Sequence, residues 1–192
     1  MRTLYFILFV ILSFCSKSIA QQHEQLPDSK KNYFGVKAGV NLSTFSGDEE
    51  SKMQLGANGG IYALYMESEH IGIQPELQYA LQGTGVSNGG HIFMHYLSIP
   101  VMLKVYPTPN FSFQAGPYAA FLLSAKYEYE AVDIKLNNTK GQDFGFAYGF
   151  SFGNEEKITF GIRHHVGLTS IYKDSKLRNQ SIQASVGFCI SK

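Results

Sequence analysis

Hydrophobic and polar residues alternate one by one along most of the chain beyond residue 32. The clearest stretch is residues 144–152, FGFAYGFSF, in which every second residue is aromatic and the residues between are Gly, Ala or Ser. A period of two places successive side chains on opposite faces of a β-strand. The pattern therefore predicts strands with one apolar face and one face of small or polar residues.

The same alternation recurs in about eight segments of about ten residues each, the length that a tilted strand needs to cross a bilayer. The segments cover residues 33–43, 55–65, 71–83, 91–106, 111–127, 142–152, 158–167 and 181–191. The connections at 67–70, 107–110 and 154–157 are tight, whereas those around 46–53, 84–90, 128–141 and 169–179 are longer. Short turns that alternate with longer loops are typical of transmembrane barrels.

Two all-β architectures fit this pattern, and they differ in which face meets the solvent. In a soluble barrel or sandwich the apolar face lies inside, whereas in a membrane barrel it faces lipid. Water-facing strands usually carry many Lys, Glu, Thr and Asp residues, but these polar faces hold mainly Gly, Ala, Ser, Asn and Gln. This composition favours a membrane barrel with a narrow lumen, and a soluble β-barrel or sandwich is the alternative.

Aromatic residues near the strand ends support the membrane interpretation, because aromatic girdles mark both interfaces of such barrels. One predicted girdle contains Tyr33, Phe34, Tyr65, Tyr106, Phe111, Phe152 and Phe160, and the other contains Phe45, Tyr79, Phe93, Tyr127 and Phe144. We therefore predict an all-β fold, an antiparallel up-and-down transmembrane β-barrel of about eight strands. A barrel of that size is just wide enough for side chains to fill it.

Residues 1–20 have the features of a secretory signal peptide. Arg2 precedes an apolar run at 4–14 that is too short to span a membrane, and small residues lead to a cleavage point before Gln21. Cys15 raises the alternative of a lipoprotein, but the residue before it is a phenylalanine and not the small residue that such a signal requires.

The rest of the chain divides into a flexible N-terminal arm at 21–32 and a barrel domain at 33–192. The formal net charge is only +1, so the sequence offers no reason to expect a nucleic-acid partner. After cleavage Cys189 is the one cysteine left, which excludes a disulfide within the mature chain.

Charged residues on the polar faces are the main site candidates. An unpaired charge in a low-dielectric interior is costly, so we expect these residues to pair with one another. The predicted structural network in the lumen consists of Lys37, Glu76, Lys104, Asp143 and Arg163. Lys126 also falls on a polar face. A gated or selective ion path is the alternative to a purely structural network.

Three prolines, Pro75, Pro100 and Pro117, fall inside predicted strands. Proline removes a hydrogen bond from the ladder, so we expect strand irregularities there, most simply β-bulges. A weak seam through which a lipid or a partner reaches the interior is the sharper hypothesis. A bulge at Pro100 could also shift which residues face inward beyond it.

No residue set predicts catalysis, a cofactor or a metal. His164 and His165 are adjacent in a strand and point to opposite faces, so they do not share one site. His91 and His95 share a face but lack further ligands at a suitable spacing. We therefore expect no enzymatic activity, and a lipid-modifying barrel enzyme is the least supported alternative.

Five segments carry a recognisable family pattern, residues 34–47, 71–85, 95–107, 113–126 and 160–172, and the strongest motifs are P-E-L-x-Y at 75–79 and Y-L-x-I-P-x-x-x-K at 96–104. In these segments the chain resembles the PorT-type, porin-like outer-membrane β-barrel family of Bacteroidota. The resemblance implies a barrel in the outer membrane of a Gram-negative bacterium. It says little about activity, although one branch of the family resembles an accessory of protein secretion.

The leading functional expectation is a small outer-membrane barrel with a structural or interaction role and exposed loops. A narrow channel or a secretion accessory is the second hypothesis. The expected partners are outer-membrane lipid, the outer-membrane insertion machinery and a protein that contacts the outward loops. The longest such loop, 128–141, is the first place to look for that contact.

Overall fold

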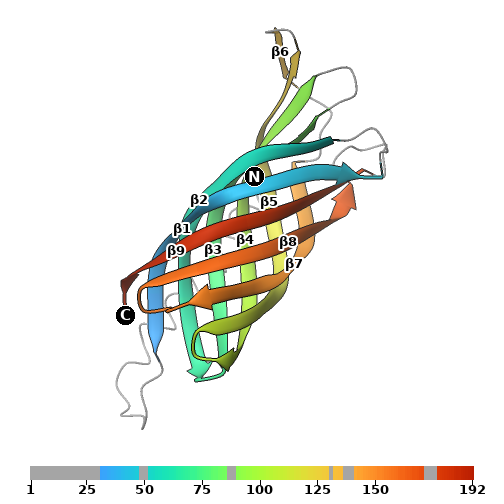
Figure 1. The fold of residues 1–192 in the computed structure, drawn as a ribbon. Coiled ribbons are helices and arrows are strands. Elements are labelled where there is room, and N and C mark those ends of the chain that lie inside the picture. Colours follow the sequence, from blue (N-terminus) through green and yellow to red (C-terminus); the bar gives the residue numbers. More distant parts are fainter. Residues whose placement is uncertain (1–30, 48–51, 86–89, 130–131, 136–140, 171–176) are drawn as a thin grey trace, which may run out of the picture.

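The computed structural model describes residues 31–47, 52–85, 90–129, 132–135, 141–170 and 177–192, which form one antiparallel sheet closed into a barrel (Figure 1). The strands are β1 (Asn32–Ser46), β2 (Lys52–Ser68), β3 (Ile71–Gly85), β4 (His91–Thr108), β5 (Phe111–Tyr129), β6 (Val132–Lys135), β7 (Gln142–Gly153), β8 (Ile158–Ser170) and β9 (Arg178–Ser191). The order is β4-β3-β2-β1-β9-β8-β7-β5-β6, and β4 also pairs with β5 to close the ring. The predicted barrel is confirmed.

The two ends of the barrel differ in their connections. At the turn end, tight turns join β2 to β3, β4 to β5 and β7 to β8, and β1 begins and β9 ends there. The loop end carries the longer connections and the β5–β6 hairpin, which projects beyond the barrel (Figure 1). The hairpin strand β6 lies within the predicted loop 128–141, and the strands reach 19 residues in β5 because pairing continues past the apolar stretches.

The proposed signal peptide at 1–20 and nearly all of the arm at 21–32 lie outside the described residues. The first strand begins at Asn32, close to the expected start of the barrel domain. Within the part of the chain that the structure describes, no helical segment has the length and hydrophobicity of a membrane span.

The faces of the strands follow the alternation of the sequence. On β7, Phe146, Tyr148 and Phe150 are 37–48% exposed on the outer surface, whereas Ala147 and Ser151 are buried inside. The same division holds for the other barrel strands. The barrel thus has an apolar outer surface and a lumen lined by small and polar residues, which is the arrangement of a membrane barrel.

Three aromatic residues assigned to the girdles lie in the lumen instead. Tyr33, Tyr106 and Phe45 are each buried, with no more than 7% of their surface exposed. Each occupies an inward position in the alternation of its strand, and the girdle assignment considered only its nearness to a strand end. The period of two decides the facing, because a shift by one residue would turn the whole strand over.

Lys126 is exposed, and the prediction that it lines the lumen is wrong. The register between β4 and β5 shifts at His95, which pairs with Ser124, whereas Tyr96 pairs with Leu122. The extra residue of β5 reverses the facing of the positions that follow it. Ala125 therefore takes the buried position beside Lys126.

The prolines of β3 and β4 leave the register unchanged. Pro75 pairs with Val101, and the ladder resumes at Gln78 and Ser98 in the same register. Pro100 is itself fully buried. The facing pattern continues unchanged beyond it, since Met102 and Lys104 are buried and Leu103 is exposed. In β5, Pro117 pairs with Phe146 within a continuous run of ladder pairs with β7, whereas on the β4 side the ladder passes from the Pro100–Tyr118 pair to the Leu103–Ala115 pair, with a gap but no change of register.

An apolar cluster occupies the lumen toward the loop end. This apolar lumen cluster consists of Phe45, Met94, Tyr96, Met102, Tyr118, Ala120, Ala125 and Ala147. A second, smaller group of Tyr33, Tyr62 and Leu64 lies toward the turn end. Between and around them the lumen is filled by polar and charged side chains.

Candidate functional site

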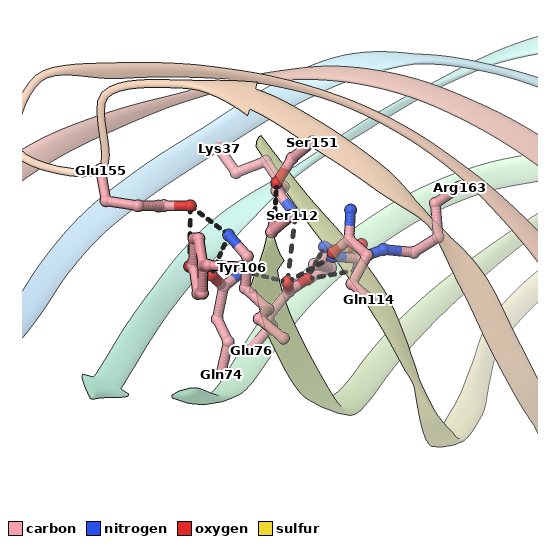
Figure 2. Close-up of polar contacts among 11 residues, drawn as sticks. Lys37, Gln74, Glu76, Tyr106, Ser112, Gln114, Ser151, Glu155 and Arg163 are labelled. Carbon is pink, nitrogen blue, oxygen red and sulfur yellow. Dashed lines mark hydrogen bonds and ion pairs between the residues drawn. The ribbon is translucent and has the colours of Figure 1, made fainter. Parts of the chain in front are cut away.

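Glu76 is the centre of a charged network in the lumen (Figure 2). Its carboxylate accepts two hydrogen bonds from the Arg163 guanidinium, at 2.8 and 2.9 Å, and one from Lys37 Nζ at 3.0 Å. Gln74 Nε2 donates to it at 2.6 Å, and Gln78 Nε2 also donates to it. A buried carboxylate with this many donors is fully compensated, which is the condition under which a buried charge is tolerated.

The alternation of each strand puts these side chains into the same space. Glu76 on β3 and Arg163 on β8 occupy inward positions, and three strands separate β3 from β8 in the sheet. Arg163 therefore reaches across the lumen to Glu76. Its ladder partner is Gly149, where an added Cβ would lie 2.8 Å from the Arg163 Cα and so crowd the strand that carries Arg163. The small residues of the inner faces leave room for the few long ones.

Lys104 has a different carboxylate partner, Glu155, which comes from the turn between β7 and β8. Lys104 Nζ donates to Glu155 Oε1 and, at 3.3 Å, to Gln74 Oε1. Tyr106 donates its hydroxyl hydrogen to the same Glu155 oxygen at 3.0 Å. Hydrogen bonds from the backbone of Asn154 and Lys157 close this turn, and Gly153 has a φ of 124° that favours glycine.

Sequence reasoning missed Glu155 because the segment 154–157 was interpreted only as a tight turn. The inner faces at the turn end carry more positive than negative residues, and this excess indicates a missing carboxylate. Lys37, Lys104 and Arg163 are three cations, and Glu76 is one carboxylate. Buried cations require partners, so a further carboxylate from a neighbouring turn could have been expected.

Asp143 lies apart from the Glu76 network. Its carboxylate accepts hydrogen bonds from Thr169 Oγ1 at 2.6 Å and from the Tyr118 hydroxyl at 3.3 Å, toward the loop end. The structure thus brings together four of the five predicted lumen charges. Lys37 and Arg163 bind Glu76 directly, and Lys104 is linked to Glu76 through Gln74. The contacts of Asp143 are with neutral hydroxyl groups instead.

The mouth of the lumen at the turn end is acidic and open. A cavity of about 820 Å³ there is lined by Tyr33, Tyr106, Glu67, Glu69 and Glu155, among others. Glu156, which also lines this cavity, is partly exposed, and its pKa is lowered by a hydrogen bond and the charge of Lys192 and, more weakly, by Lys31. Deeper inside the lumen lies a small cavity of about 10 Å³, next to Lys37 and Lys104.

The histidines lie in separate surroundings. His165 is buried in the lumen beside the Tyr118 ring, whereas His164 points outward and its Nδ1 lies 2.9 Å from the Tyr148 hydroxyl. His91 contacts Gln54 and His95 contacts Tyr79. Among the described residues, no group of three or more His, Cys, Asp or Glu side chains is arranged to hold a metal ion.

Comparison with known proteins agrees with this geometry. A family model described as outer membrane protein beta-barrel domain matches residues 19–173. The chain is structurally similar to Neisserial surface protein A, with a TM-score of 0.62 and 11% identity over 84% of this chain and all of the other. It is also similar to Ail, the attachment invasion locus protein of Yersinia pestis, with a TM-score of 0.54 and 11% identity over 84% and 100%. No curated protein matches the chain.

Proposed function

The chain belongs to the outer membrane protein beta-barrel domain family, and from that premise we propose that it is a sealed membrane scaffold that presents its loop end to a partner outside the cell. Its place is the outer membrane, where the apolar outer surface contacts lipid. The role is structural or one of binding a partner, and the scaffold is the closed barrel of eight strands, from which β6 projects.

The filled lumen is the observation that carries this proposal. The Arg163–Glu76 pair spans the interior from β8 to β3, Glu155 covers Lys104 at the turn end, and the apolar lumen cluster occupies the loop half. The cavity between Lys37 and Lys104, inside the lumen, has space for about one water molecule. Such an interior supports a barrel that anchors and presents loops better than one that conducts solutes.

The β5–β6 hairpin supports an interaction role for the loop end. It projects beyond the barrel (Figure 1), with β6 paired to the end of β5 and the start of β4 paired to the other side of the same β5 residues. Loops held by a rigid scaffold are a common place for recognition. The name of one similar protein, Ail, refers to attachment and invasion, and a contact with a surface or partner outside the cell is the corresponding role proposed for this chain.

The proposal includes several finer expectations from the sequence. The chain is exported through a signal peptide at 1–20, is assembled by the outer-membrane insertion machinery and belongs to the PorT-type barrels of Bacteroidota. It acts without catalysis, and the separate surroundings of the histidines support that view.

Planar-bilayer recording tests whether the barrel is sealed. We expect no steady conductance from the purified, folded protein. In the double variant Glu76→Ala/Arg163→Ala the two side chains that meet across the lumen are gone, so we expect conductance events to appear. Gel mobility before and after boiling verifies that each sample is folded. A steady conductance of the unaltered protein would contradict the proposal and support the narrow channel.

Cysteine labelling in whole cells tests which end faces outward. In a Cys189→Ser background, Asp133→Cys places a thiol on the projecting hairpin and Asn110→Cys places one in a turn at the opposite end. A membrane-impermeant maleimide should label the first in intact cells and the second only after the cells are opened. The reverse pattern would overturn the proposed outward presentation of the loop end.

A role as an accessory of protein secretion is the second candidate, and the cavity of about 820 Å³ at the turn end favours it. An acidic, aromatic-lined mouth would suit contact with a positively charged segment on the periplasmic side. Reversing the charge of Glu67 and Glu69 together should lower the amount of secreted protein if this role holds. Unchanged secretion by a folded variant would exclude it.

A further inference from the structure

We propose that the turn half of the lumen binds one small monovalent anion, such as chloride, between Lys37 and Lys104. The small cavity there has about 10 Å³ of space for an occupant, enough for one water molecule or small ion. Lys37 and Lys104 line it together with the hydroxyl-bearing residues Ser151, Thr159 and Ser185. None of the described residues that line it carries a carboxylate.

The charges around this cavity do not balance. Three cations, Lys37, Lys104 and Arg163, share two carboxylates, those of Glu76 and Glu155. Asp143, the other buried carboxylate in the described part of the chain, contacts two hydroxyl groups toward the loop end and none of these cations. One positive charge therefore remains in a region where an uncompensated ion is very costly.

The hydrogen-bond donors at the site also exceed the protein acceptors that contact them. Lys37 Nζ carries three hydrogens and contacts Glu76, and Lys104 Nζ carries three and contacts Gln74 and Glu155. Among the described oxygen and nitrogen atoms, each ammonium group thus has at least one hydrogen without an acceptor, although Lys104 Nζ also lies 5.4 Å from the centre of the Tyr106 ring. Both residues border the same cavity. An anion at this point accepts these hydrogens and neutralises the remaining charge.

The size of the cavity selects among anions. A carboxylate, phosphate or sulfate has several heavy atoms and does not fit a space for one. A water molecule fits but leaves the positive charge in place, unless one lysine loses its proton. A halide is a single atom, only somewhat larger than a water molecule, and it compensates the charge. The site stands independently of whether the loop end binds a partner.

Bromide soaking tests the site directly. Crystals of the full mature chain grown in bromide should show an anomalous scattering peak within contact distance of Lys37 Nζ and Lys104 Nζ. Density there without an anomalous signal would mean that water fills the cavity and that one ammonium group is neutral. That result would overturn the proposal.

Thermal unfolding in detergent micelles gives a second test, with sodium chloride and sodium gluconate compared at equal ionic strength. Binding to the folded state alone raises its stability, so we expect the unfolding midpoint in chloride to be higher by about 3 °C. At Gly161 an added methyl group would meet Gln114 Nε2 and Ser185 Oγ at 3.5 and 3.6 Å, in ordinary contact, and would narrow the cavity that Gly161 lines. Gly161→Ala should lose more than half of the chloride effect.

Gly59→Ala is the matched control. Gly59 also lies in a strand, but an added methyl group there would meet only the carbonyl oxygen of Lys37, at 3.6 Å, and the residue does not line the cavity. This variant should keep the full chloride effect. An equal response of all three proteins, or no response of the unaltered protein, would show that chloride does not bind at this site.

Discussion

The two halves of the lumen are filled by different kinds of side chain. Toward the turn end, Glu76 and Glu155 hold Lys37, Lys104 and Arg163 in a network of ion pairs. Toward the loop end, the apolar lumen cluster packs Phe45, Met94 and Tyr96 together, and polar contacts there are mostly between neutral groups. The same barrel strands, with residues that alternate between inward and outward positions, surround both halves.

The two halves thus fill the lumen of a narrow barrel in different ways. Apolar packing gains stability from burial and needs no partners of a particular charge. An ion network needs every member, because the loss of one partner leaves another charge buried and unpaired. We therefore expect substitutions in the turn half to cost more than those in the loop half, although the side chains are similarly buried.

Glu76→Ala should have the largest effect. It removes the acceptor of Arg163 and Lys37 at once, and we expect the free energy of unfolding to fall by about 3–5 kcal/mol. Urea titration of the refolded protein in micelles, followed by gel mobility without boiling, measures this loss. Glu76→Gln, which keeps the size but not the charge, should remain clearly destabilised. Near-normal stability of both variants would mean that the network contributes little.

Met94→Ala tests the loop half. The side chain is fully buried in the apolar lumen cluster, and its loss leaves a cavity that costs about 2–4 kcal/mol. Because no charge is exposed or stranded, Met94→Leu should restore most of the stability in the same urea titration. A loss as large in Met94→Leu as in Met94→Ala would contradict packing as the stabilising term.

Asp143→Asn should have a smaller effect than either. The amide oxygen still accepts one hydrogen bond, but one of the hydroxyl groups of Thr169 and Tyr118 loses its acceptor, at a cost of about 1–2 kcal/mol. A loss comparable to that of Glu76→Ala would show that Asp143 is coupled to the buried cations after all, and the distinction between the two halves would fail.

Glu156→Gln should have the smallest effect, with no measurable change in the urea midpoint. Its side chain is 35% exposed and contacts the exposed Lys192 and Lys31 at the surface, where ion pairs contribute little. The adjacent Glu155→Gln is the contrast, because Lys104 is 2% exposed and loses its carboxylate partner. Equal stability of the two variants would argue against the buried role assigned to Glu155.

Much of the fold could be predicted because side chains in a barrel strand alternate between the lumen and the outer surface, and this period of two is visible in the sequence. The inward placement of Lys37, Glu76, Lys104, Asp143 and Arg163 followed from that period alone. The same rule places Tyr33, Tyr106 and Phe45 in the lumen, where they are buried, and it outweighs the preference of aromatic residues for the interfaces at strand ends. The facing of Lys126 could not be predicted, because nothing local in the sequence marks the bulge that precedes it.

By itself the sequence determined the wall of this protein: the strands, their antiparallel order and the surface that faces lipid. Those features depend on side chains near one another along the chain. The tertiary structure alone decided which side chains meet inside the lumen. Arg163 reaches Glu76 although three strands separate β8 from β3 in the sheet, Glu155 points inward to Lys104, and Asp143 lies apart from this network. These contacts depend on how the strands are staggered when the sheet closes, and closure is a property of all strands together.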